Sequence, residues 1–61
     1  MQLRTLLIRL NEHQIIELWQ DENELYHGKV KDMPSELLTE SIDMLETIHT
    51  SREDILVIYI Y

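Results

Sequence analysis

The sequence contains no cysteine, and it has only one glycine, Gly28, and one proline, Pro34, among its 61 residues. Without cysteine, the chain can form neither a disulfide nor a thiolate metal site, and it has no cysteine nucleophile. Because glycine and proline are so rare, we expect mostly regular secondary structure in a single domain, residues 1–61. A domain of this size buries only about 60 % of its unfolded surface, so a partner subunit would be a natural source of further stability.

Positive charge is also scarce. Five Lys and Arg residues face twelve Asp and Glu residues, which gives a net charge of −7. Phosphate backbones repel such a surface, so direct nucleic-acid binding is disfavoured and partners with a basic surface are favoured. His13, His27 and His49 fall on separate segments, and no phosphate-binding glycine loop or Ser-His-Asp motif is present. We therefore expect a protein without enzymatic activity, metal site or cofactor.

Long hydrophobic runs are missing. The longest uncharged apolar run, "ILVIYIY" at residues 55–61, is far shorter than the roughly 20 residues that span a bilayer. The apolar stretch at the N-terminus is interrupted by Arg4 and Arg9, which is not typical of a signal peptide. The chain is therefore expected to be cytoplasmic, in agreement with its lack of cysteine.

The run at residues 55–61 predicts a strand. Alternate side chains of a strand point to opposite faces. One face would carry Ile55, Val57, Tyr59 and Tyr61, and the other Leu56, Ile58 and Ile60. Both faces are apolar, and so short a chain is not expected to cover both. This segment therefore predicts an interface, either with another protein or in a homo-oligomer.

The first half of the chain predicts a helix and a hairpin. Leucines at helical spacing indicate a helix over residues 2–10, with a strand as the alternative. Residues 15–31 read as two strands around the polar turn 21–24, and Trp19 favours the strand assignment. Gly28, inside the second strand, predicts a bulge or a close approach by another group.

Residues 33–49 carry the strongest helical pattern. One side of this helix would hold Leu37, Leu38, Ile42, Leu45, Ile48 and His49. Pro34 would occupy the first turn, where its missing N–H is harmless. A strand over residues 42–48 is the alternative, but Glu46 would interrupt its apolar face. The predicted fold is thus α+β: an α-β-β-α-β domain with a three-stranded antiparallel sheet on one long amphipathic helix, with β-β-β-α-β as the alternative.

The polar side of this predicted helix is the main candidate site. It carries Glu36, Glu40, Asp43 and Glu46, and residues 33–49 contain no Lys or Arg. Neighbouring like charges cost an exposed helix roughly 0.2–0.5 kcal/mol per pair. A negative strip of this kind could imitate a nucleic-acid backbone and dock in a basic groove. The alternative is a solvated face of an acidic protein.

Aromatic side chains would complete the predicted partner-binding site. Trp19, Tyr59 and Tyr61 are expected to supply apolar contact from the exposed sheet face or from the edge of the terminal strand. Tyr and Trp are favoured anchors at protein interfaces.

The stretch "LYHGKVKDMPSELL", residues 25–38, resembles part of a known group of sequences. The matching positions are Tyr26, Gly28, Lys29, Val30, Asp32, Pro34, Leu37 and Leu38. The group consists of small, acidic, uncharacterised proteins of phages, prophages and mobile elements of Gram-positive bacteria, and it includes anti-CRISPR-type inhibitors. The resemblance implies a mobile-element accessory protein and does not name its target.

Two functional hypotheses result. In the first, the chain is a small acidic protein-binding module that inhibits or modulates a host nucleic-acid-handling protein, as an anti-CRISPR-like protein would, by occupying a basic surface. In the second, it is a homo-oligomeric structural or assembly module of a phage, joined through residues 55–61, without an inhibitory role.

Overall fold

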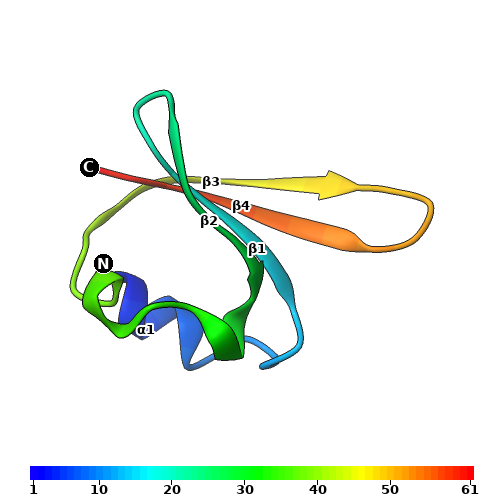
Figure 1. Ribbon diagram of the computed structural model, residues 1–61, viewed down its shortest axis with the longest axis horizontal. Helices are drawn as coiled ribbons and strands as arrows, with labels where there is room; N and C mark the ends of the chain where they lie inside the picture. Colours follow the sequence, from blue (N-terminus) through cyan, green and yellow to red (C-terminus); the bar gives the residue numbers. More distant parts are fainter.

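The computed structural model describes residues 1–61 as a four-stranded mixed sheet with a helical layer on one side (Figure 1). In chain order the elements are α1 (Leu3–Leu7), β1 (Ile15–Gln20), β2 (Asn23–Lys29), the 3₁₀ turns η1 (Val30–Asp32) and η2 (Ser35–Leu37), β3 (Ile42–His49) and β4 (Asp54–Ile60). The strand order is β2-β1-β4-β3. The inner strands β1 and β4 are parallel, and both outer pairs are antiparallel.

The strand β4 lies inside the sheet, as expected for a segment with two apolar faces. Val57 and Ile58 point to opposite faces, and both are buried, with only 2 % and 0 % of their surface exposed. The prediction of a two-sided apolar strand is therefore confirmed. The chain shields this strand by itself, however, because β1 and β3 flank it on both edges. Burial of β4 does not require a second molecule.

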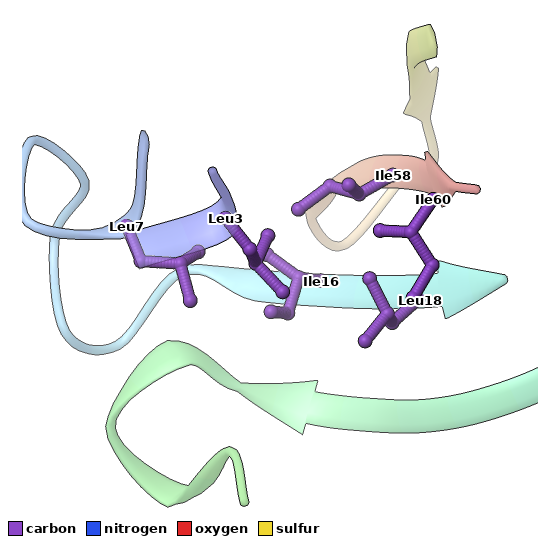
Figure 2. Packing of buried hydrophobic residues seen from close by; sticks show 6 residues of the cluster. All are labelled: Leu3, Leu7, Ile16, Leu18, Ile58 and Ile60. Carbon is purple, nitrogen blue, oxygen red and sulfur yellow. The ribbon is translucent and has the colours of Figure 1, made fainter. Parts of the chain in front are cut away.

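The hydrophobic core lies between the sheet and α1. Its buried side chains come from the helix and from the two inner strands, and they point toward one another in Figure 2: Leu3, Leu7, Ile16, Leu18, Ile58 and Ile60. Residues 2–10 thus contain the predicted helix, shortened to Leu3–Leu7. No helix of the structure has the length and apolarity needed to cross a membrane.

The rest of the helical layer is the segment that connects β2 to β3. These strands are the two edges of the sheet, so the chain must travel about 14 Å, three strand spacings, across its width. It crosses on the side of α1, as the green ribbon in Figure 1 shows, and adds four apolar side chains to the core: Val30, Met33, Leu37 and Leu38. The Arg4 N–H donates a hydrogen bond of 2.9 Å to the Leu38 carbonyl and so joins the crossing segment to the helix.

The predicted long helix over residues 33–49 is wrong, and so are the three-stranded α-β-β-α-β topology and its β-β-β-α-β alternative, since both contain this helix. Residues 35–37 form only a 3₁₀ turn, and residues 42–49 form β3. A β-bulge between Ile42 and Met44 explains the misleading pattern. Without it, Ile42 and Leu45 would point to opposite faces, but the extra residue places both opposite core-facing residues of β4, Ile60 and Ile58. A spacing of three residues, typical of a helix, here belongs to a bulged strand.

The predicted hairpin is confirmed, with a turn at Asp21 and Glu22. Gly28 marks a close approach, one of its two predicted roles. A Cβ at Gly28 would lie 2.7 Å from the hydroxyl oxygen of Tyr26, which donates a hydrogen bond of 2.6 Å to the Lys29 carbonyl. The irregularity of this strand pair lies elsewhere, opposite Leu18 and Trp19.

A matched pair of alanine substitutions tests the helix–sheet core. Leu3 is fully buried, whereas Ile8, at the C-terminal end of α1, is 77 % exposed. Leu3→Ala should lower the free energy of unfolding by about 2–5 kcal/mol because it leaves a cavity under the sheet. Ile8→Ala should change it by no more than about 0.5 kcal/mol. Urea denaturation followed by circular dichroism measures both values, and equal losses would contradict this core.

Candidate functional site

The face of the sheet opposite α1 is covered by no element of the chain. All segments that pack on the core lie on the α1 side (Figure 1). Cross-strand partners point to the same face, so the strand register identifies the side chains of the uncovered face. From β2 to β3 they form three rows: Lys29, Ile15, Ile55 and Ile48; His27, Glu17, Val57 and Glu46; Glu24, Trp19, Tyr59 and Met44. These residues are called the open face below.

The centre of the open face is apolar and closely packed. Val57 and Ile55 are buried although no helix or strand covers them, because the side chains around them exclude water. Trp19 and Tyr59 are paired across β1 and β4, and both are half-buried. The open face therefore presents two aromatic rings around an aliphatic centre that neighbouring side chains already shield from water.

Two carboxylates flank this centre. Glu17 on β1 and Glu46 on β3 are both paired with Val57, so they lie roughly 10 Å apart, two strand spacings. Glu17 accepts a hydrogen bond of 3.0 Å from the indole N–H of Trp19, and Glu46 accepts one of 3.2 Å from the hydroxyl of Tyr59. Each carboxylate is thus held by an aromatic residue and keeps acceptor capacity for another donor.

The positive charges of the chain lie mostly elsewhere. Of the five Lys and Arg residues, Arg4, Arg9 and Lys31 belong to or adjoin α1 and η1, Arg52 lies in the β3–β4 turn, and only Lys29 belongs to the open face. The three ion pairs of the structure all use histidine, and one of them joins His27 to Glu24 at 3.4 Å on the open face. Neither Glu17 nor Glu46 has a cationic partner within the chain.

The four predicted acidic residues do not form a strip. Glu36 lies in η2, Glu40 follows it in the crossing segment, and Asp43 lies in the bulge of β3. Of the four, only Glu46 belongs to the open face. The regular spacing that would imitate a phosphate backbone depended on a helix, and this helix does not form.

The structure brings two of the three predicted aromatic residues together. Trp19 and Tyr59 are neighbours on the open face, close to Glu46. Tyr61 lies beyond the end of β4 and is 70 % exposed. The Asp43 carboxylate raises the pKa of Tyr61, first by hydrogen bonding to the phenol and then by its negative charge.

Sequence reasoning missed Glu17. The signal was present in the alternation of β1, where Glu17 falls on the same face as Ile15 and Trp19. An acidic residue inside an apolar strand face is costly to bury, so it indicates a face that stays in contact with water or meets a cation. The same argument applies to Glu46, although the pattern of residues 33–49 alone sets this residue against a strand.

A tyrosine titration tests the link between Tyr59 and Glu46. Burial and the negative charge of Glu46, with a smaller effect of Glu17, raise the pKa of Tyr59 above its ordinary value of about 10. The phenol of the folded protein therefore keeps its proton at a higher pH than in the unfolded chain, and the stability that this provides is present below about pH 10 and lost above it. Glu46→Gln should lower the pKa of Tyr59, as measured from its ring carbon chemical shift. Glu22→Gln, in the β1–β2 turn, is the control and should leave it unchanged.

Neither cavities, nor metal-binding clusters, nor comparisons with known proteins identify a function for this chain. The structure contains no pocket, and no group of three or more His, Asp or Glu side chains is placed to hold a metal ion. The chain matches no family model, no curated protein and no solved structure. Functional inference therefore depends on the geometry and charge of the open face and of the sheet edges.

Proposed function

We propose that this protein is a small acidic binding module that docks its open face on another protein. The observation that carries the proposal is a sheet face that no helix or strand of the chain covers, with exposed Met44 and Ile48, half-buried Trp19 and Tyr59, and two hydrogen-bonded carboxylates beside its centre. Val57 would lie at the middle of the contact and the two glutamates on either side of it.

The carboxylates define the chemistry of the partner. A protein that covers Val57 also removes water from Glu17 and Glu46, and a buried carboxylate without a cation is strongly unfavourable. The partner must therefore place Lys or Arg side chains opposite these residues. Arg suits the site best, because its guanidinium can pair with a carboxylate and at the same time lie on the ring of Trp19 or Tyr59.

The aromatic residues supply the apolar part of the contact. Trp19 and Tyr59 are large, half-buried and already held by hydrogen bonds to Glu17 and Glu46. Ordering of side chains is one of the main costs of association, and here most of this cost has been met during folding. Trp and Tyr are also the residue types that most often dominate binding energy at interfaces.

A second copy of the chain is a poor occupant of this face. Face-to-face stacking of two copies would bring Glu17 and Glu46 of each copy against an acidic face with a single lysine. A protein that binds nucleic acid has the required surface, since it uses Lys and Arg to neutralise phosphates. Together with the resemblance of residues 25–38 to mobile-element proteins, this makes a nucleic-acid-handling protein of the host the first class of partner to test.

The test compares two double variants with equal loss of charge. Glu17→Gln with Glu46→Gln removes both carboxylates of the open face but keeps acceptors for Trp19 and Tyr59. Glu22→Gln with Glu36→Gln removes two exposed carboxylates outside it. Loss of a buried charge pair typically costs about 2–5 kcal/mol, so the first variant should bind its partner more than tenfold more weakly.

The wild-type protein and both variants are immobilised, and the proteins that each retains from a Gram-positive cell extract are identified. The affinity of each for the purified partner is then measured. A partner of the open face is retained by the wild type and by the Glu22/Glu36 variant and is lost by the Glu17/Glu46 variant. Equal retention by all three proteins would refute docking through the open face. Circular dichroism of each variant shows whether the fold has survived.

A further inference from the structure

The two edges of the sheet differ in their protection against pairing with another strand. Natural edge strands usually carry charged side chains, especially Lys, or Pro or a bulge that discourages such pairing, and Gly weakens a strand. The outer edge of β2 contains Gly28 and Lys29 and is irregular opposite Leu18 and Trp19. By contrast, the eight residues of β3, Ile42–His49, contain no Lys, Arg, Pro or Gly. Its bulge lies at one end, so the remainder of the strand is regular.

The hydrogen bonds show which backbone groups of β3 are free. The Tyr61 N–H donates to the Ser41 carbonyl, so odd-numbered residues of β4 direct their backbone groups toward β3. Their partners, Glu46 opposite Val57 and Ile48 opposite Ile55, therefore point inward. The backbone groups of the intervening residues, Leu45, Thr47 and His49, point to the outer edge.

The N-terminus occupies only the beginning of this edge. The Ile42 N–H donates to the Met1 carbonyl at 2.9 Å, and Gln2 forms a bridge with Ser41. Beyond the bulge, no segment of the chain lies beside β3, which extends past the helical layer in Figure 1. The free edge therefore runs over residues 44–49.

This free edge carries exposed apolar side chains on both faces, beside the polar Glu46, Thr47 and His49. Leu45, on the helical side, is 44 % exposed, while Met44 and Ile48, on the open face, are 48 % and 44 % exposed. No other strand of the sheet leaves three large apolar side chains so exposed. A partner that covers only one face would leave the other uncovered, whereas an added strand shields both.

We propose that a second copy of the chain pairs with this edge, β3 against β3, in an antiparallel and two-fold symmetric dimer. An edge strand is complementary to itself in this arrangement, because each copy supplies the same free N–H and C=O groups. The pairing joins two four-stranded sheets into a continuous sheet of eight strands. Its hydrogen bonds use the edge alone, so the dimer does not require the proposed partner of the open face.

Charge selects the register of this dimer. Outward-pointing residues must pair with outward-pointing residues, which leaves two registers near the middle of the free edge, centred on Glu46 or on Thr47. The first would place Glu46 directly opposite the partner's Glu46 at the shorter cross-strand spacing, and like charges there are destabilising. The second places Glu46 opposite the partner's Ile48 and Leu45 opposite the partner's His49. No carboxylate then faces a carboxylate, and the two Thr47 residues pair on the symmetry axis.

This register also joins the two open faces. A two-fold axis perpendicular to the sheet leaves the open faces of both copies on the same side of the joined sheet. Met44, Glu46 and Ile48 of both copies therefore line one continuous surface. A partner with a repeated or elongated basic surface could then meet both copies at once, and its affinity would gain from the linkage.

Sedimentation equilibrium of the wild-type chain tests the dimer directly. Between about 10 μM and about 1 mM, the average mass should rise from 7.4 kDa toward twice this value. In a sample that mixes isotope-labelled and unlabelled chains, a filtered nuclear Overhauser experiment should show contact between the Hα atoms of Glu46 and of the partner's Ile48. An Hα contact between Met44 and the partner's Ile48 would overturn the register, and a constant mass of one chain would overturn the dimer.

Two proline substitutions locate the interface. Thr47→Pro removes an outward N–H from β3 without loss of a hydrogen bond within the sheet. It deletes two hydrogen bonds across the symmetry axis, so the dissociation constant should rise about 30-fold or more. His27→Pro is the matched control on the outer edge of β2, where the Val30 N–H bond to the Gln14 carbonyl indicates that His27 also points outward. The proposal fails if Thr47→Pro leaves the dimer intact or if His27→Pro weakens it equally. If either variant unfolds, the Hα contact between Glu46 and the partner's Ile48 in the mixed wild-type sample still tests the interface.

Discussion

The position of β4 between two other strands is the constraint on which the rest of the structure depends. A strand that is apolar on both faces is poorly suited to the edge of a sheet, where its side chains would be exposed to water, so it needs a neighbouring strand on each edge. Its neighbours are β1, in parallel, and β3, in antiparallel orientation. Because β2 already occupies the other edge of β1, the chain has to cross the whole sheet before β3 can form. This crossing segment, together with α1, supplies the cover for one face.

Residue patterns within single segments were sufficient to predict the β1–β2 hairpin, β4 and the helix near the N-terminus. The alternation in residues 15–31 predicted the hairpin, and the uncharged run at residues 55–61 predicted β4. Leucine spacing predicted a helix over residues 2–10, and the structure contains the shorter α1, in which Leu3 and Leu7 lie about one helical turn apart and are both buried. Gly28 predicted a bulge or a close approach, and only the close approach is present; the side chain that approaches, Tyr26, could not be named from spacing alone.

Residues 33–49 could not be assigned in this way, because two different structures satisfy the same pattern. The bulge next to Met44 gives a strand the three-residue spacing of a helix. Two facts favoured the strand: the neighbouring like charges, which weaken a helix, and the need of β4 for a second partner strand. The second fact concerns residues far apart in the sequence and outweighs local propensity. The predicted acidic strip was lost with the helix, while Trp19, Tyr59 and Glu46 came together through the sheet register.

The two glutamates of the open face make its binding selective, although the face also carries exposed apolar side chains. A face of the same size with only aliphatic side chains would associate with any apolar surface, including another copy of itself. Glu17 and Glu46, on either side of Val57, make every such contact unfavourable, because each would remove water from two carboxylates without giving them a cation. The hydrogen bonds from Trp19 and Tyr59 hold the carboxylates in place, so a correctly spaced cationic partner finds both acceptors already oriented. Glu17 and Glu46 keep the open face from being covered by an apolar element of the chain. The same two residues therefore restrict the partners of this face to proteins that supply cations.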